Sequence, residues 1–560
     1  MSKIFVLLAL LLSILATIWP YHFDPFRAFQ SEMLAVLAFL LIGIAALMKR
    51  TRTSVRVSYL LFVLLALLVP LLQKMLGLVA FWQDAFFYSA NLLLAAFALI
   101  CGDLVGDDHK ATADQIAARL AFFMIAIGVP TLAICLYQLF GFNFLPKFVN
   151  TITGDRLYGN LIQPNHIAFL LLASALGITY FVLIQRIRVG WGLLLLSLFG
   201  FVLGGVGSRT TLLALVIISG LMVWMYGVKR RNLDLWLCLL ALTFTYSVTL
   251  FVVHPILLEI FHDSSTRSLS IGVQSPRVRI WKDLIEALLE KPLTGWGSGQ
   301  IPVAYSQLDT YPLKTELATD AHNLFLNFGL WFGIPLGALM LFLMFYRFAA
   351  IFSLKMDNPS LAIFLGSLAL LFVSHGLTGR AVNYTYIYLP ALFCVGLMSS
   401  SSKTFAVSML DHKIAIPPSA PRMALVIMLA FTALVWVHYQ HMLTKDRYVK
   451  IQEAGLPDFD IPELAHKSMI FDNQYAFLDY AVESYESPLD AQTFEGLVYL
   501  VQRNPGAGAI IKLLSIAEES NYCSHIPAIE RMLVRFHGEE MLERARTAVV
   551  VPNCAAEPKE

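Results

Sequence analysis

Charged residues are scarce in this chain of 560 residues, making up 14% of it, whereas hydrophobic residues make up 58%. A soluble globular domain is about one quarter charged and about half apolar. Mean hydropathy is +0.69, and apolar runs long enough to cross a bilayer recur along the chain. The composition therefore excludes an ordinary soluble domain and predicts an all-α polytopic membrane protein.

Cysteine is also scarce, and the six cysteines show no metal-ligand spacing. Four of them lie in apolar runs, where a cysteine is usually a small buried hydrophobe. Cys523 and Cys554 are the only pair in the polar C-terminal tail. They are candidates for a disulfide if the tail lies outside the cytoplasm.

The tail lacks an excess of basic residues. Residues 445–560 hold 11 basic and 19 acidic residues, a net charge of about −8, which excludes a nucleic-acid-binding arm. Apolar residues at helical spacing in 461–466 and 507–519 predict helices there. At the other end, an apolar run after Lys3 resembles a signal peptide but has no convincing small-x-small cleavage site, so we interpret it as a retained first helix.

The apolar runs predict about 13 transmembrane helices. They are expected near residues 4–19, 32–48, 55–72, 85–101, 117–139, 166–185, 190–206, 210–226, 235–253, 323–345, 360–375, 385–399 and 423–441.

Lysine and arginine in short loops predict the orientation of these helices. Basic residues gather on the side of the N-terminus, which is therefore assigned to the cytoplasm: Lys49, Arg50, Arg52, Arg56, Arg186, Arg188, Lys229, Arg230, Arg231, Arg347, Lys355, Lys403 and Lys413. The loop 102–116 is an exception on this side, because its aspartates outnumber its one lysine. Acidic residues count little in this rule, so the predicted topology stands.

This topology divides the chain into four expected parts. They are transmembrane helices in 1–253, a large periplasmic loop in 254–321, further transmembrane helices in 322–441, and a soluble helical periplasmic domain in 442–560. The loop is by far the longest connection, and long loops are more often functional than accidental.

Four groups of unusual residues fall on the predicted outer side. The first is Gly159-Asn-Leu-Ile-Gln-Pro-Asn-His-Ile-Ala168, which brings Gln163, Asn165 and His166 to the mouth of a helix. Amide and imidazole groups there suit substrate binding by hydrogen bonds. A competing interpretation is helix capping, because Asn165 is a good N-cap and Pro164 helps to end the preceding turn.

The second group is the glycine-rich turn Gly204-Gly-Val-Gly-Ser-Arg-Thr-Thr211, which carries Arg209 at the start of a helix. A guanidinium beside the N–H donors of a helix start makes an anion site suited to phosphate. An interfacial arginine that extends outward is the alternative.

The third group, Ser275 to Glu290, predicts an amphipathic helix on the membrane surface. Its apolar stripe is Ile280, Trp281, Leu284, Ile285, Leu288 and Leu289. Its basic residues Arg277 and Arg279 offer donors to a pyrophosphate. Surface pairs four residues apart, such as Arg279 with Asp283, are the alternative.

The fourth group contains Leu293-Thr-Gly-Trp-Gly-Ser-Gly299 and His322. The glycines predict tight turns that fold the loop back toward His322. His322 precedes an apolar helix expected to run to about Leu343. A histidine at this place can take up and release a proton near neutral pH, although a lone histidine at a helix mouth is more often structural.

Together these residues resemble the O-antigen ligase and polymerase superfamily of bacterial membrane glycosyltransferases. The resemblance rests on Gly207-Ser-Arg-Thr210, Pro276-Arg-Val-Arg-Ile-Trp281, Pro292-Leu-Thr-Gly-Trp-Gly-Ser-Gly299 and Ala321-His-Asn-Leu-Phe-Leu326. Within the superfamily, residues 159–168 are similar to the short signature of the PglL-like protein O-oligosaccharyltransferases, the pilin glycosylation ligases.

The resemblance implies an enzyme of the bacterial inner membrane, with its site facing the periplasm. Its expected reaction transfers a preassembled glycan from undecaprenyl pyrophosphate to Ser/Thr of an acceptor protein such as a pilin. Arg209, Arg277 and Arg279 are implied to bind the donor pyrophosphate. His322, Arg279 and Arg209 are the implied catalytic residues: the arginines stabilise charge on the leaving group, and His322 accepts the hydroxyl proton or orients the acceptor. Gln163, Asn165 and His166 are expected at the acceptor or glycan entrance.

No cofactor, metal or nucleic acid is expected in this reaction, because the lipid pyrophosphate already carries the activation. One departure from the family pattern lies in Ser374-His-Gly-Leu-Thr-Gly-Arg-Ala-Val382, where Gly379 and Ala381 stand in place of an acidic residue and a proline. Transfer to lipid A, glycan polymerisation and, more distantly, transport remain alternatives.

Overall fold

Helices make up almost the whole structure, a computed structural model. It describes residues 2–48, 50, 53–107, 113–150, 156–161, 163–226, 233–262, 276–308, 319–351, 358–379, 383–401, 409–454, 468–548 and 554. Within these ranges, nine helices are long and apolar enough to cross a membrane. Four shorter apolar helices lie at other expected positions. The chain is a polytopic all-α membrane protein; the count of 13 spans stays a prediction.

The chain forms two compact units. Unit 1 comprises Met1–Leu65, Asn91–Leu269 and Met340–Ala433, and unit 2 comprises Ala66–Ala90, Ser270–Leu339 and Leu434–Glu560. Four helices have residues in both units: α3 (Val57–Met75), α4 (Trp82–Gly106), α14 (Ile334–Phe345) and α18 (Ser419–Glu453).

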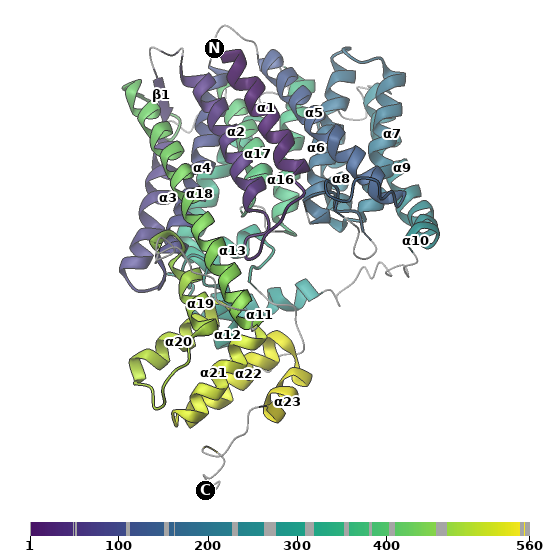
Figure 1. Ribbon diagram of the computed structural model, residues 1–560. Helices are drawn as coiled ribbons and strands as arrows, with labels where there is room; N and C mark the ends of the chain where they lie inside the picture. The colour runs from purple at the N-terminus through teal and green to yellow at the C-terminus, as the bar shows by residue number, and fades with distance from the viewer. Residues whose placement is uncertain are drawn as a thin grey trace. The chain divides into compact units, whose positions relative to one another are not determined.

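The other elements of unit 1 are mainly long apolar helices (Figure 1). They are α1 (Ser2–Ile18), α2 (Phe29–Leu47), β1 (Thr53–Arg56), α5 (Ala113–Leu139), α6 (Pro164–Leu183), α7 (Val189–Val206), α8 (Arg209–Tyr226), α9 (Leu233–Val248), η1 (Thr249–Val253), α10 (His254–His262), η2 (Tyr346–Ala350), α16 (Pro359–Gly376), α17 (Thr385–Ser401) and β2 (Lys413–Ile416).

Helix α6 is the central helix of unit 1, because it is buried along nearly its whole length and packs on α5, α7 and α16. Small residues allow this close packing. A Cβ on Gly128 of α5 would lie 1.9 Å from Oγ of Ser174. Ser174 instead donates a hydrogen bond to the carbonyl of Met124 at 2.8 Å. Glycine and serine thus allow α5 and α6 to pack closely at the middle of α6.

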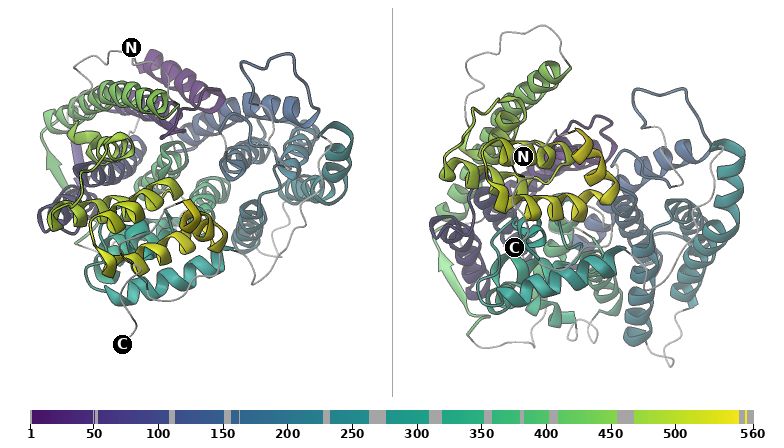
Figure 2. Two further views of the ribbon diagram at one scale, coloured as in Figure 1. Left: turned by 60° about the horizontal axis from the view of Figure 1, so that its bottom comes forward. Right: turned by 90° about the horizontal axis from the view of Figure 1, so that it is seen from below.

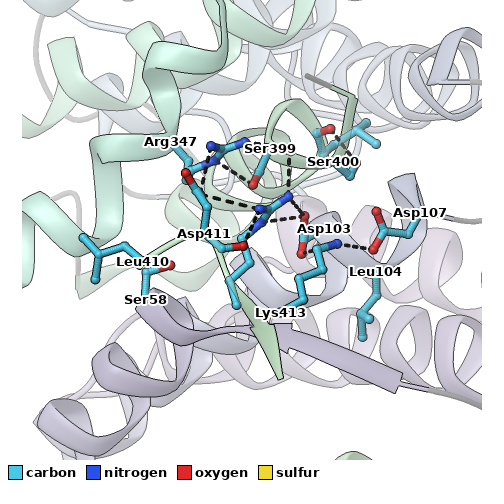
Figure 3. Close-up of polar contacts among 12 residues, drawn as sticks. Ser58, Asp103, Leu104, Asp107, Arg347, Ser399, Ser400, Leu410, Asp411 and Lys413 are labelled. Carbon is cyan, nitrogen blue, oxygen red and sulfur yellow. Dashed lines mark hydrogen bonds and ion pairs between the residues drawn. The ribbon is translucent and has the colours of Figure 1, made fainter. Parts of the chain in front are cut away.

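A buried ion-pair network joins the ends of several helices in unit 1 (Figure 3). Asp411 pairs with Arg347 at 2.9 Å and with Arg56 at 3.5 Å. Asp103 of α4 pairs with Arg56 at 3.1 Å and with Lys413 at 3.2 Å. The short antiparallel sheet supports this network, because Arg56 of β1 lies opposite Lys413 of β2.

The network accounts for the acidic exception among the basic loops. Asp103 and Asp107 both form ion pairs with Lys413, which belongs to the predicted cytoplasmic set. These aspartates therefore neutralise neighbouring basic residues and do not contradict the predicted orientation. Buried charges are tolerated when they are paired and hydrogen-bonded in this way.

Unit 2 combines the large loop with the C-terminal tail. Its elements are α11 (Pro276–Glu290), α12 (Ile301–Gln307), α13 (Leu324–Phe332), η5 (Met469–Phe471), α19 (Asp472–Val482), α20 (Ala491–Arg503), α21 (Ala507–Glu519), η6 (Cys523–His525), α22 (Ile526–His537) and α23 (Glu539–Ala548). Figure 2 shows the C-terminal helices, in yellow, beside teal helices. Both α20 and α22 contact α12.

The tail is held to the rest of unit 2 by polar contacts. Asp472 accepts hydrogen bonds from the backbone N–H groups of Trp82 and Gln83, at 2.7 and 2.8 Å, and so caps the start of α4. Arg503 forms an ion pair with Asp84 at 2.6 Å. The tail is therefore packed against α4.

The sequence-based expectations for the tail have different outcomes. The helix predicted in 507–519 is present as α21, whereas residues 461–466 lie outside the described residues. A disulfide joins Cys523 to Cys554, which confirms the predicted pair.

The ion-pair network predicts a large loss of stability when one arginine is removed. Arg347 is buried, and it also donates hydrogen bonds to the hydroxyl and carbonyl of Ser399 at 2.9 and 2.8 Å. Arg347→Met should lower the free energy of unfolding by about 3–5 kcal/mol, because it leaves Asp411 buried with fewer partners. Equilibrium unfolding in detergent measures this. The exposed control Arg119→Met should change it by less than about 0.5 kcal/mol; equal effects would contradict the structural role.

Candidate active site

The predicted site residues fall into both units. Gln163, Asn165, His166 and Arg209 belong to unit 1, and residues 270–339, which contain Arg277, Arg279 and His322, belong to unit 2.

In unit 1, the loop before α6 is fixed by amide side chains. The Nε2 group of Gln138 donates to the carbonyls of Asn150 and Gly159 at 2.8 and 2.9 Å, and the N–H of Gly159 returns a hydrogen bond to its Oε1. Nδ2 of Asn160 donates to the carbonyls of Ile18 and Phe148 at 2.7 and 2.8 Å. The conformation of the 159–166 segment is thus set by α5 and by the end of α1.

Asn165 binds a side chain and does not cap the helix. The N-cap of α6 is Gln163, whose side chain makes no capping hydrogen bond, and Pro164 occupies the first turn. The Oδ1 atom of Asn165 instead accepts a hydrogen bond from Oγ of Ser208 at 2.7 Å. The capping interpretation is therefore wrong for Asn165, which links the 159–168 segment to the glycine-rich turn.

That turn leads directly into the helix that begins at Arg209. Gly207 ends α7 in the left-handed region, with φ of 59°, a conformation that favours glycine. Arg209 is the first residue of α8, as the sequence predicted; its side chain lies outside the described part of the structure. Next to it, the hydroxyls of Thr210 and Thr378 lie 2.8 Å apart.

His166 lies in a buried aromatic cluster. Its Nδ1 lies 2.7 Å from the hydroxyl of Tyr386, and its ring centroid lies 4.0 Å from that of Tyr384 and 5.7 Å from that of His375. His166 is only 1% exposed, so a substrate at the surface of this group would meet Gln163 and Asn165, which are half-buried, before it met His166.

Sequence reasoning missed the two tyrosines of this cluster. Tyr384 and Tyr386 follow α16 in the chain, and Nε2 of Gln163 lies 3.5 Å from the hydroxyl of Tyr384. The two tyrosines of Asn383-Tyr-Thr-Tyr386 are only a weak indication of a functional site, because tyrosines at this spacing also occur where side chains simply pack in a protein core. In the segment 374–382, which departs from the family pattern, Ala381 lies outside the described residues.

In unit 2, a tryptophan ties the basic helix α11 to the histidine loop. Nε1 of Trp281 donates to the carbonyl of Ala321 at 2.7 Å, the residue before His322. Arg277 is four residues before Trp281 and so lies on the same face of α11. The structure therefore brings the basic end of α11 close to the loop that carries His322.

The loop around His322 is held in an unusual conformation. His322 has φ of 51°, a left-handed conformation that few residues other than glycine adopt. Its N–H donates to Oδ1 of Asp320 at 2.7 Å, and Nδ2 of Asn327 donates to both oxygens of Asp320 at 3.2 Å. Such strain persists only where the surroundings enforce it, and it concentrates at functional sites.

Helix α11 only partly matches the predicted amphipathic stripe. Ile280 and Leu284 are buried as expected, whereas Ile285 and Leu289 are 49% and 66% exposed. Arg279 is exposed and Arg277 is half-buried. Although Asp283 is four residues after Arg279, no ion pair forms between these two described residues. The guanidinium of Arg279 is thus placed where an anion can reach it.

The helix after His322 differs from the prediction. It was expected to run unbroken to about Leu343, but it ends at Phe332, and α14 begins at Ile334. Gly333 between them has φ of 78° and ψ of 163°. Gly333 and Pro335 explain the break, because glycine adopts this conformation without strain and proline has no N–H to donate to the carbonyl of Trp331, four residues earlier.

The glycine-rich segment 292–299 fills this break. The N–H of Ile334 donates to the carbonyl of Pro292 at 2.7 Å, and the N–H of Trp296 donates to that of Leu330 at 2.6 Å. Nε2 of Gln73 donates to the carbonyl of Trp331 at 2.6 Å. The predicted turn is therefore present, and it packs on α13, the helix that follows His322.

Chemically, unit 2 presents guanidinium groups and an imidazole on connected segments. This set can bind an anionic phosphate and exchange a proton. Within the described ranges, no group of three or more His, Cys, Asp or Glu residues is arranged to hold a metal ion.

The break at Gly333 predicts that adding a single methyl group there lowers the stability of the fold strongly. Gly333→Ala should destabilise the fold by about 3 kcal/mol, because its backbone conformation is nearly restricted to glycine and the new Cβ would lie 2.1 Å from the carbonyl oxygen of Leu293. Thermal unfolding in detergent measures this. Gly220→Ala is the control, since nothing lies within 4 Å of its Cβ position; equal melting temperatures for the two variants would refute the strained break.

Comparisons with known proteins agree with these features. Residues 192–343, which contain α11 and His322, match the O-antigen ligase family. The chain is 26% identical over 474 residues to the general O-oligosaccharyltransferase of Acinetobacter baylyi, covering 81% of this chain and 79% of the relative. It is 27% identical over 362 residues to the ComP-specific O-oligosaccharyltransferase of that organism, covering 62% of each. The chain is therefore similar to protein O-oligosaccharyltransferases and contains a segment that matches the O-antigen ligase family.

Proposed function

We propose that this protein transfers a preassembled glycan from undecaprenyl pyrophosphate to a serine or threonine of an exported acceptor protein, such as a pilin. The observation that carries the proposal is the Trp281–Ala321 hydrogen bond, which joins the helix of Arg277 and Arg279 to the loop of His322. This arrangement lies within the segment that matches the O-antigen ligase family.

The reaction breaks one bond and forms one. The acceptor hydroxyl oxygen attacks the anomeric carbon of the glycan, while the bond from that carbon to the pyrophosphate oxygen breaks. Undecaprenyl pyrophosphate leaves with the electron pair of that bond. The hydroxyl proton passes to the imidazole of His322, which later releases it to solvent.

The arginines act on the leaving group. Negative charge grows on the pyrophosphate as the glycosidic bond breaks, and fixed guanidinium groups stabilise it. Arg277 and Arg279 on α11 supply such groups. Arg209 takes the same donor-binding role, supported by its place at a helix start after a glycine-rich turn.

For Gln163, Asn165 and His166 we propose contacts with the acceptor or the glycan. Gln163 and Asn165 are half-buried and carry amide groups suited to hydroxyl recognition. His166 is buried and supports them through the tyrosine cluster.

We also propose the bacterial inner membrane as the location, with the site facing the periplasm. The basic loops on the opposite side support this orientation. The Cys523–Cys554 disulfide agrees with it, because disulfides persist in oxidising compartments such as the periplasm. The segment 442–560 would then be a periplasmic domain.

Two other acceptors give competing functions within the same superfamily: lipid A, for an O-antigen ligase, and a growing glycan, for a polymerase. The names of the two Acinetobacter relatives favour a protein acceptor. A transporter is disfavoured by these relatives.

Co-expression with a lipid-linked glycan pathway and a candidate pilin tests the proposal. Wild-type protein should increase the mass of the pilin by one glycan. Arg279→Ala should reduce the rate about 10²–10³-fold through lost charge stabilisation, and His322→Ala about 10²–10⁴-fold through lost proton transfer. Mass spectrometry of the intact pilin measures both.

The control is Arg188→Ala, an exposed arginine on the predicted cytoplasmic side, which should leave the rate unchanged. Glycan on lipid A with an unmodified pilin would refute the acceptor. Full activity of both the Arg279 and His322 variants would refute the site.

A further inference from the structure

Arg535, in the C-terminal tail, is buried and reaches into the large loop. It is only 2% exposed. Its Nη1 donates to the carbonyl of Tyr305 at 2.7 Å and its Nη2 to the carbonyl of Leu308 at 2.8 Å. These carbonyls lie at the C-terminal end of α12, where a cation is electrostatically favourable. Arg535 thus fixes the end of α12.

Holding this charge in the interior is costly. Burial lowers the pKa of Arg535, which means that the surroundings disfavour its charged form. An apolar side chain of similar length would pack there without that cost. What the guanidinium adds is a fixed, forked donor that holds two carbonyls at once.

Tyr305 connects Arg535 to the basic helix. Its ring centroid lies 5.2 Å from the guanidinium of Arg535, and its hydroxyl donates to Oδ2 of Asp283 on α11 at 3.2 Å. Tyr305 is fully buried, and its ring packs edge-to-face on Phe536. The backbone and ring of one tyrosine are therefore held by the tail, while its hydroxyl holds α11.

Two hydrogen bonds then fix the rotation of α11 about its long axis. One is the bond from Tyr305 to Asp283, and the other is the bond from Trp281 to Ala321. Arg279 lies one turn before Asp283, so a rotation of α11 would carry Arg279 away from its place. Release of Asp283 would also let it pair with Arg279, four residues earlier.

We propose that Arg535 is a positioning residue for the donor-binding helix α11, acting through Tyr305 and Asp283. The inference rests on the proposed function, since it assumes that Arg277 and Arg279 bind the pyrophosphate. The C-terminal tail then has a direct part in donor binding, because it sets the orientation of these arginines.

The test uses the full-length protein with a lipid-pyrophosphate-linked glycan and an acceptor protein, and measures kcat and both KM values. Tyr305→Phe removes only the hydroxyl and should raise the donor KM about tenfold, the effect of losing a hydrogen bond to a charged group. The acceptor KM should not change. Arg535→Met should raise the donor KM at least as much. Arg535→Lys should give a donor KM between those of the wild type and Arg535→Met, because an ammonium can still donate to one of the two carbonyls.

Arg531→Met is the matched control, because Arg531 is exposed on the same helix; it should leave both KM values unchanged. An unchanged donor KM in Tyr305→Phe, or a parallel rise of both KM values, overturns the inference. If Arg535→Met does not fold, Tyr305→Phe decides alone. Absence of transfer by the wild-type protein would refute the proposed function, which is a distinct outcome.

Discussion

Backbone groups freed by the interruption at Gly333 must find partners, and unit 2 supplies them from two other segments. An unpaired buried N–H or carbonyl costs several kcal/mol in an apolar environment. The 292–299 segment and Gln73 satisfy the groups on both sides of the break. Because the segment must reach the break, the chain between α11 and α13 folds back on itself, and α11 comes to lie beside the His322 loop.

The placement of charge distinguishes buried, paired arginines from an exposed arginine that is open to an anion. In unit 1, Arg56 and Arg347 are buried and paired with aspartates, as a scaffold requires. In α11, by contrast, Arg279 is exposed and makes no ion pair with a described residue, although Asp283 lies within one turn. A chain with so few charged residues does not need an arginine there for packing, which supports a role in binding an anion.

The sequence predicted the helical membrane class well, because long apolar runs have few alternative structures. It also located α11, the start of α13 and the Cys523–Cys554 pair. The break at Gly333 was missed because apolar residues continue through 323–345, and their pattern outweighed Gly333 and Pro335. The link between His166 and Tyr386 joins positions too far apart in the chain for any local pattern to reveal. Helix capping competes as an interpretation of Asn165 because its partner, Ser208, is 43 residues away, also beyond the reach of a local pattern.

In the proposed reaction, one enzyme couples release of a polyprenyl pyrophosphate to glycosylation of a protein hydroxyl. The most direct measurement uses purified protein in proteoliposomes with a synthetic undecaprenyl-pyrophosphate-linked glycan and an acceptor protein. We expect undecaprenyl pyrophosphate to be released in an amount equal to the glycan found on serine or threonine. Release of the lipid without glycan on the protein, or glycan found on a second lipid or sugar, would contradict it.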